Sequence, residues 1–225
     1  MILGSATWTE LSGQTGGSTL VIPLGSTEQH GPHLPLSTDT DIAVAVAEGA
    51  AALRPHVVVA PALPYGSSGE HAEFPGTLSI GQAALEHVVV ELVRSADHFG
   101  AVVLASGHGG NLEALRRAVA ALTGEGRHVA VWTPSGAVDA HAGRTETSIA
   151  LALDASRVRV DQAERGDTRP LGELLPSLRA GGVRSVTPNG VLGDPAGASA
   201  EEGLQLLSLL IADLVATVDE LAVRG

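Results

Sequence analysis

The sequence predicts an α/β protein, a three-layer α/β/α sandwich with a mostly parallel sheet. Four short, continuous apolar runs are each bounded by glycine, proline or a polar turn, which is typical of buried parallel strands. Apolar-periodic segments of helical length separate these runs. Regular alternation of strands and helices favours a sheet that is covered by helices on both faces.

The predicted elements alternate along almost the whole chain. The strands are expected at residues 20–24, 57–62, 102–105 and 129–132. The helices are expected at residues 42–53, 82–98 and 112–122, with a fourth beginning near Thr145 and a fifth at 201–223. Residues 160–199 are rich in turn-forming residues, and we expect them to pack over the functional site or against a neighbouring subunit.

Length and composition limit the function. A chain of 225 residues fits one domain, residues 1–225, and can bury about 70% of its surface without a disulfide or a structural metal. A metal site in this chain would therefore be expected to take part in catalysis and not to be required for folding. The chain has no cysteine, and all 13 of its basic residues are arginine. These absences exclude thiolate nucleophiles, iron–sulfur clusters, lysine Schiff bases and a phosphate-binding P-loop lysine.

Charge and hydropathy exclude further classes. The formal net charge of -12 argues against binding to nucleic acid or to anionic membranes, because both depend on clustered positive charge. The start of the chain lacks a basic region followed by an apolar core, and Asp213 interrupts the apolar stretch 204–218. We expect a cytoplasmic protein with no nucleic-acid partner and no membrane partner.

A polar motif follows each predicted strand. The motifs in chain order are GSTEQHGPH, PYGSSGEHAEFPGT, SGHGGN and SGAVDAHAGRTETS. Ligands of parallel sheets collect beyond the carboxyl ends of the strands, where such loops converge. The sequence therefore predicts one functional site built from four loops.

The first motif offers metal ligands. Glu28 and His30 are two residues apart, so an extended backbone points both side chains to the same side, and Asp39 can return to them after a turn. Zinc, manganese and ferrous iron accept such carboxylate and imidazole donors. The alternative is a solvated acidic turn in which Asp39 or Thr40 caps the next helix. For Asp41, in the first turn of that helix, capping is as plausible as ligation.

The other motifs add histidines and carboxylates. Glycines on both sides of His108 let its ring approach a metal closely, although the motif also fits a simple turn in which Asn111 caps a helix. His141 and Glu146 are five residues apart, and either could ligate, or His141 could move protons.

Glu70 and His71 form a plausible substrate wall or support for the ligands, or else part of a mobile glycine-serine loop. Other histidines, which lack nearby acidic or glycine-rich loops, are expected to be ordinary: His56, His87, His98 and His128.

The motifs together resemble a known family. GSTEQHGPH with Asp39, then GEHxxFPGT, SGHGGN and HAGRTETS, is similar in order and spacing to the creatininase family of dinuclear metal amidohydrolases. The resemblance implies that Glu28, His30, His108 and a bridging Asp39 hold two divalent metal ions per subunit. It implies zinc or ferrous iron, with manganese as an alternative, and makes His141 the proton-transferring histidine.

Two departures from creatininase itself affect the expected chemistry. A metal-binding glutamate follows two residues after the histidine that matches His108, whereas this chain has Gly110. We expect Glu146 to replace that carboxylate. The tryptophan that closes over creatinine before the histidine matching His141 is also absent, so creatinine is not the expected substrate.

The C-terminal part resembles one branch of the family. PLGELLPSLRAGGV followed by GVLGDPAGASAEEG is similar to peptidases that cut a radical-modified precursor peptide near its C-terminus and release a cross-linked valine–tyrosine-derived fragment. The family's ring-like assemblies imply a homo-oligomer, a hexamer-like ring or larger.

We therefore predict a metal-dependent peptidase or amidohydrolase whose metal ions activate water for attack on an amide carbonyl. The predicted metal ligands are Glu28, His30, Asp39, His108 and Glu146. His141 and Glu146 are the predicted catalytic residues, and His141 passes a proton to the leaving amine. Glu70 and His71 are predicted to contact the substrate. The alternatives are a family member acting on a small cyclic amide or a formamide, and a non-catalytic binding or assembly protein.

Overall fold

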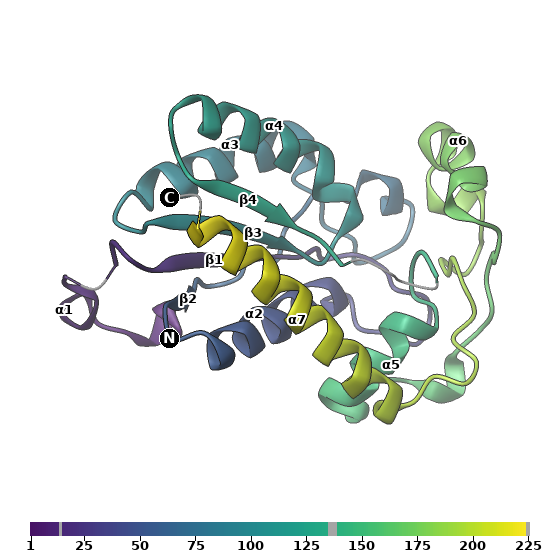
Figure 1. Ribbon diagram of the computed structural model, residues 1–225. Coiled ribbons are helices and arrows are strands. Elements are labelled where there is room, and N and C mark those ends of the chain that lie inside the picture. The colour runs from purple at the N-terminus through teal and green to yellow at the C-terminus, as the bar shows by residue number, and fades with distance from the viewer. Residues whose placement is uncertain (14, 135–138, 224–225) are drawn as a thin grey trace.

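A parallel sheet forms the middle layer of the molecule. The computed structural model describes residues 1–13, 15–134 and 139–223. Its sheet has four strands in the order β2-β1-β3-β4, and every neighbouring pair is parallel (Figure 1). The strands are β1 (Thr19–Leu24), β2 (Val57–Val59), β3 (Ala101–Ser106) and β4 (Val129–Trp132). The predicted α/β class is confirmed.

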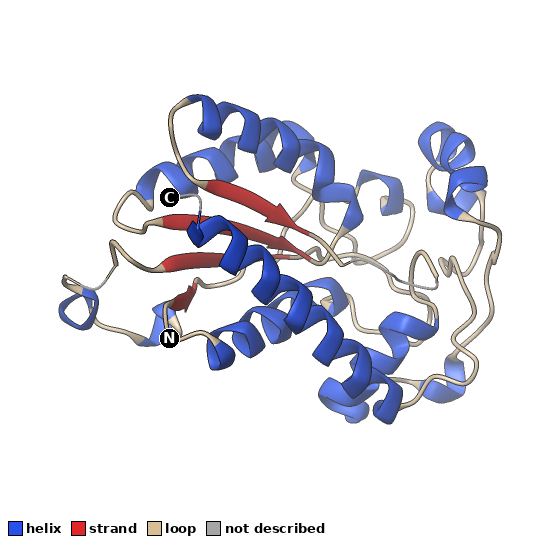
Figure 2. Cartoon of the chain, in the orientation of Figure 1, coloured by secondary structure: helices blue, strands red, loops and turns tan. Residues whose placement is uncertain are grey.

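Helices cover both faces of this sheet (Figure 2). Helices α3 (Gly81–Ser95) and α4 (Leu112–Gly124) cover one face, and α2 (Thr38–Leu53), α5 (Arg144–Asp154) and α7 (Ala200–Val223) lie on the other. Helices α1 (Trp8–Leu11) and α6 (Leu171–Gly181) lie away from both faces (Figure 1). Among the described residues, no helix is both long enough and apolar enough to cross a bilayer.

Two hydrophobic cores lie on opposite sides of the sheet. Alternate side chains of a strand point to opposite faces. Ile22 of β1 accordingly packs with Leu85 of α3 and Leu115 of α4. Its neighbour Val21 packs on the other face with Leu214 of α7. The alternation along β1 thus creates the three layers.

Several predicted boundaries differ from the structure. The expected strand 57–62 ends at Val59, although Ala60 and Leu63 still donate backbone hydrogen bonds to β1. Helix α2 begins at Thr38, so its first turn already includes Asp39. Helix α3 ends at Ser95, before the expected end at residue 98.

The turn-rich stretch 160–199 contains a helix that was not predicted. Helix α6 spans Leu171–Gly181 and includes Pro176. Its leucines recur at helical spacing and Leu174 is buried, but the prolines and glycines around them resemble turns. Helix α6 contacts the 3-10 turn Gly69–His71, so this stretch does lie beside one of the predicted motif loops.

Helices α5 and α7 pack tightly and hold the end of the fourth motif in place. A Cβ atom on Gly203 of α7 would overlap the backbone oxygen of Ser148 in α5. The Ser148 hydroxyl and Arg144 both donate hydrogen bonds to Glu202, at 2.7 and 2.9 Å. Because α5 carries Glu146 in its first turn, this packing positions a predicted site residue.

We expect Gly203→Ala to lower the free energy of unfolding by about 1–3 kcal/mol, because the added methyl group forces the two helices apart. Gly172→Ala is the matched control, since a Cβ there meets nothing within 4 Å and alanine favours helix by about 0.5–1 kcal/mol. Urea unfolding of both variants measures the difference. Equal stabilities would contradict the proposed helix contact.

Candidate metal centre

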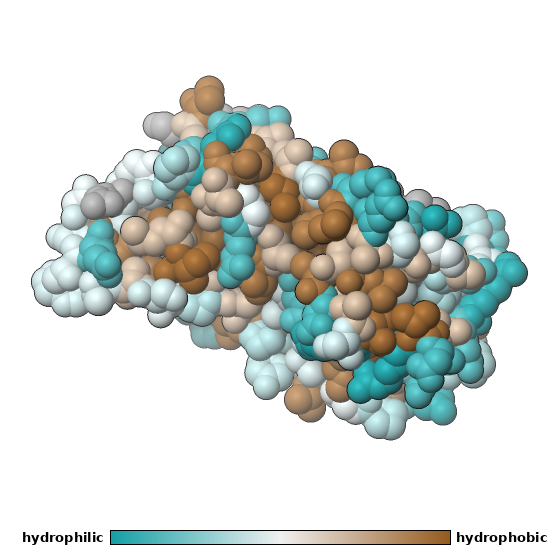
Figure 3. Space-filling model, turned by 90° about the horizontal axis from the view of Figure 1, so that it is seen from below, coloured by the Kyte–Doolittle hydropathy of each residue, from teal (hydrophilic) through white to brown (hydrophobic). Residues whose placement is uncertain are grey.

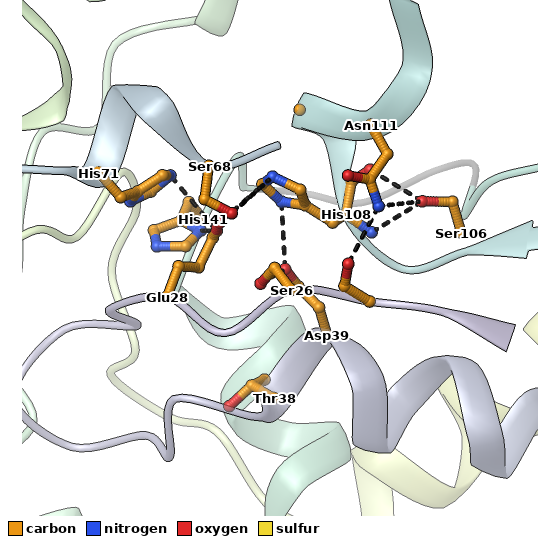
Figure 4. Close-up of polar contacts among 12 residues, drawn as sticks. Ser26, Glu28, Thr38, Asp39, Ser68, His71, Ser106, His108, Asn111 and His141 are labelled. Carbon is orange, nitrogen blue, oxygen red and sulfur yellow. Dashed lines mark hydrogen bonds and ion pairs between the residues drawn. The ribbon is translucent and has the colours of Figure 1, made fainter. Parts of the chain in front are cut away.

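Four loops beyond the strand ends bring carboxylates and imidazoles together. Figure 4 shows Glu28, Asp39, His71, His108 and His141 close to one another. Glu28 and His30 follow β1, and His108 follows β3. Asp39 lies in the first turn of α2. All the residues of this group are less than a tenth exposed: Glu28, His30, Asp39, His71, His108 and His141.

Asp39 lies between two imidazoles. Its Oδ1 accepts a hydrogen bond from His30 Nε2 at 3.0 Å, and its Oδ2 lies 3.1 Å from His108 Nδ1. Ser26 Oγ also donates to Oδ2, at 2.7 Å. Burial alone would raise the pKa of Asp39, but the two imidazoles hold it well below its usual value. Asp39 is therefore an ionised carboxylate with one oxygen toward each histidine.

Glu28 is fully buried without a hydrogen-bond donor for either carboxylate oxygen among the described residues. The two oxygens lie 3.3 Å from His71 Nε2 and 3.2 Å from His108 Nε2. Burial raises the pKa of Glu28 to about 7, against the opposing effect of His108. A buried carboxylate is costly unless it is paired, hydrogen-bonded or bound to a metal, so Glu28 is suited to a cation.

The donor atoms form three overlapping groups, each within 4.8 Å. The groups are Glu28 with Asp39 and His108, Glu28 with His71 and His141, and His30 with His141 and Glu146. Carboxylate and imidazole donors without thiolates suit zinc, manganese or ferrous iron. The residues present thus fit divalent metal binding.

Glu146 reaches the same cluster as the ligands expected from the first motif. Its Oε2 lies 3.9 Å from His30 Nε2 and accepts a hydrogen bond from the backbone N–H of Ala142. Burial raises the pKa of Glu146 to about 7, although His30 opposes this effect. Glu146 thus shares a donor group with His30 and His141, and its role as the replacement carboxylate stays a prediction.

Gly110 occupies a position that admits no side chain. A Cβ atom there would overlap His108 Nε2 and the backbone oxygen of Ser67, and would lie 2.5 Å from Glu70 Oε1. The carboxylate that the sequence comparison found missing therefore cannot be restored by substitution alone.

His141 is oriented by a backbone carbonyl. Its Nε2 donates to Gln29 O at 2.8 Å, which leaves Nδ1 facing Glu28 Oε1 at 3.9 Å. Burial, aided by the positive charge on His30, holds the pKa of His141 well below its usual value. The ring is therefore neutral, and its Nδ1 lone pair can accept a proton or bind a metal.

Glu70 and His71 differ in their surroundings. His71 is buried, with Nδ1 2.8 Å from Gln29 Nε2 and Nε2 facing Glu28, so it is placed to orient or supplement the ligands. The Glu70 side chain is 34% exposed and its Oε1 lies 3.9 Å from His108 Nε2. Glu70 is thus at the open edge of the cluster, and substrate contact by either residue stays a prediction.

The non-catalytic roles considered for Asp39 and Asn111 are wrong. Asp39 is buried, not part of a solvated turn. Asn111 does not cap the next helix, because its side chain accepts from Ser67 N at 2.9 Å and donates to Gly25 O at 3.0 Å.

Asp41, in contrast, pairs with Arg157 at 2.8 Å and accepts from Ser37 Oγ at 2.8 Å. These partners keep Asp41 outside the cluster. The histidines expected to be ordinary also lie outside the three donor groups: His56, His87, His98 and His128.

Sequence reasoning missed two residues of the first motif. The Gln29 side chain donates to Gly190 O at 3.0 Å and accepts from Gly31 N at 2.9 Å, which joins this loop to the C-terminal stretch. His33 is buried, and its Nε2 lies 2.8 Å from Thr147 Oγ1 of α5. Their place within GSTEQHGPH was the available signal, but neither forms an obvious ligand pair in the sequence.

The comparisons with known proteins agree with this α/β fold and with a cluster of carboxylates and imidazoles that could hold divalent metal ions. The family model described as creatininase, creatinine amidohydrolase, matches residues 4–218. The chain belongs to the creatininase family and is an enzyme that hydrolyses C–N bonds.

Curated relatives cover most of the chain. A mycofactocin precursor peptide peptidase of Mycobacterium ulcerans is 47% identical over 96% of this chain and 90% of that protein. The protein of the same name from Mycolicibacterium smegmatis is 51% identical over 85% of this chain and 81% of its own. A creatinine amidohydrolase of Pseudomonas putida is 34% identical, but over only 48% of this chain and 45% of that protein.

Solved structures share the fold over nearly the full length. A creatinine amidohydrolase superposes with a TM-score of 0.79 and 26% identity, covering 97% of this chain and 96% of that one. A structure titled "Creatininase Mn" gives a TM-score of 0.80 with 97% of both chains covered and 26% identity. Another structure, of a mutant creatininase, is described as the Zn-Zn type. Relatives with this fold thus bind divalent metals.

Asp39→Ala is expected to weaken binding of Mn²⁺ by at least about 100-fold, because loss of even an outer partner of a ligand costs 10- to 100-fold. Asp41→Ala is the matched control on the same helix, since Asp41 pairs with Arg157 away from the cluster. Calorimetric titration of metal-free protein with Mn²⁺ checks both variants. Unchanged affinity in Asp39→Ala would show that Asp39 is not a ligand.

Metal binding is expected to strengthen as pH rises from about 6 to 9. Burial lowers the pKa of His30 and of His108, but Asp39 and Glu28 outweigh this effect and raise both values to about 10. Below pH 10 these imidazoles therefore hold protons that a metal must displace. Titration in two buffers of different ionisation enthalpy measures the protons released. No buffer dependence at pH 7 would contradict the raised pKa values.

Proposed function

We propose that this enzyme is a metal-dependent peptidase that cleaves the radical-modified mycofactocin precursor peptide near its C-terminus. Cleavage releases the cross-linked valine–tyrosine-derived fragment. Identities of 47% and 51% with mycofactocin precursor peptide peptidases support this substrate. The observation that carries the hydrolytic chemistry is the buried Glu28, whose two carboxylate oxygens each face an imidazole, of His71 and of His108. His108 also lines a cavity together with Asp39.

The buried donors would hold two divalent ions, of zinc, ferrous iron or manganese. The proposed ligands are Glu28, His30, Asp39, His108 and Glu146. Asp39 is the proposed bridge, because it directs one oxygen toward His30 and the other toward His108. When bound, such ions polarise an amide carbonyl and lower the pKa of water.

The protein's own groups would move the proton. In His141 the Nε2–H is engaged by Gln29 O, so the proton acceptor is Nδ1 on the side of the cluster. A neutral imidazole can take a proton from the attacking water and pass it to the leaving amine. Glu146, whose pKa of about 7 lies near neutrality, is the second proposed catalytic group. Gln29 positions the His141 ring and is not itself a proton carrier.

Substrate would enter from the open edge of the cluster. Glu70 is about one third exposed at that edge and can accept hydrogen bonds from peptide N–H groups. His71, which is buried against Gln29 and Glu28, would support the site from the inside. We also propose a homo-oligomer, a hexamer-like ring or larger.

A second candidate is hydrolysis of a small cyclic amide or a formamide. The similarity to the creatinine amidohydrolase of Pseudomonas putida favours it, although this covers only half of the chain. Such an enzyme would use the same buried carboxylates and imidazoles, so only the substrate separates the two candidates.

Incubation of the metal-loaded enzyme with the modified precursor peptide is expected to release the C-terminal fragment, detected by mass spectrometry. His141→Ala should lower kcat by about 100-fold or more, because a positioned proton carrier contributes about that factor. His98→Ala, at an exposed histidine outside the cluster, should retain activity.

Two results would contradict the proposal. One is faster turnover of creatinine or formamide than of the modified peptide by the same preparation. The other is cleavage of the peptide that persists after a chelator has removed the metal while circular dichroism shows an intact fold.

A further inference from the structure

The cavity beside the metal-ligand cluster is lined by both polar and apolar side chains. It measures about 380 Å³, within the range typical of ligand-binding pockets. Its polar lining includes Asp39, His108, His141 and Glu146. Its large aliphatic lining residues are Ile42, Leu112, Ile149, Leu206, Leu209 and Leu210. The catalytic chemistry described above uses only the polar side chains.

Three of these apolar residues come from one helix. Leu206, Leu209 and Leu210 are spaced by three and four residues in α7, so they lie on the same helix face. We call this group the leucine wall. Leu210 is 9% exposed and belongs to the second hydrophobic core, and Leu206 packs against that core. Two members of the wall are thus held in place by the fold.

Leu209 is different because the core does not use it. Its side chain is 68% exposed, on a helix of the face that Figure 3 views, where apolar side chains gather. The exposed apolar surface of Leu209 is not stabilised by burial within the fold. An apolar ligand that covers this surface would bind more tightly, by about 25 cal/mol for each Å² of apolar surface removed from water.

We propose that the leucine wall is a specificity subsite for the bulky apolar group of the fragment that leaves as the amine. This inference rests on the proposed peptidase function. A group held between the wall and the cluster would have its amide nitrogen close to His141, the proposed proton donor. The joined valine and tyrosine side chains supply the branched aliphatic and aromatic carbon that such a wall accommodates.

Continuity with the ligand cluster favours substrate over a second copy of the chain as the occupant. The same cavity contains Asp139, Thr133 and Thr145 besides the catalytic side chains. A subunit seated on the wall would cover the cavity that contains Asp39, His108, His141 and Glu146.

The test compares Leu209→Asn with Leu204→Asn. Leu204 is on the same helix and is 58% exposed, but it does not line the cavity. Leu209→Asn is expected to lower kcat/KM for the modified peptide about tenfold, mainly through KM. It should weaken inhibition by the released fragment by a similar factor, whereas Leu204→Asn leaves both values unchanged. Urea unfolding confirms that both variants are folded.

Each other outcome has a separate meaning. If the wild-type enzyme does not cleave the modified peptide, the proposed function fails, and calorimetric binding of the synthetic fragment to the wild type and both variants still tests the wall. If the wild type cleaves but the two variants behave alike, the subsite is wrong. A change of solution mass in Leu209→Asn alone, measured by light scattering, would identify the wall as a subunit contact and overturn the proposal.

Discussion

The need to compensate buried negative charge organises the centre of this protein. Glu28 and Asp39 lie beyond the end of a parallel sheet, and neither is exposed to more than a trace of solvent. Burying an ionised carboxylate is unfavourable unless opposite charge or hydrogen bonds replace the lost water. The loops meet this need mainly with imidazoles, at 3.0 Å for His30 and 3.1 Å for His108 around Asp39. The same arrangement leaves the oxygens of Glu28 without hydrogen-bond donors in the described part of the chain. A centre of this kind is suited to binding cations.

The surrounding polar side chains hold the loops in one arrangement. Asn111 joins Gly25 to Ser67, which lie in the loops after β1 and β2. Gln29 joins the first motif to Gly190 and contacts His71. These bonds are buried, where an unpaired partner would be costly, so each bond favours a single conformation. Precise placement of the histidines therefore depends on amides that do not themselves belong to the donor groups.

Much of the fold and part of the centre were accessible to sequence reasoning. Buried parallel strands leave continuous apolar runs, and the four runs correctly located β1, β2, β3 and β4. The polar motif after each run identified the loops that converge. Helix α6 was missed because its prolines and glycines conceal a helical leucine spacing. Gln29 and His33 were missed because their partners, Gly190 and Thr147, are more than 100 residues away in the chain.

The sequence by itself determined the α/β alternation, the class of donor atoms and the loops that contain them, because these follow from periodicity and residue type. Only the tertiary structure decided which donors meet. It placed Asp39 inside the cluster and Asp41 outside it, although both lie in the first turn of α2, because residues two apart in a helix point in different directions. It also showed that Gly110 has no room for a side chain and that leucines of α7 line the cavity beside the histidines. Such contacts join distant segments, and local sequence patterns carry no record of those distances.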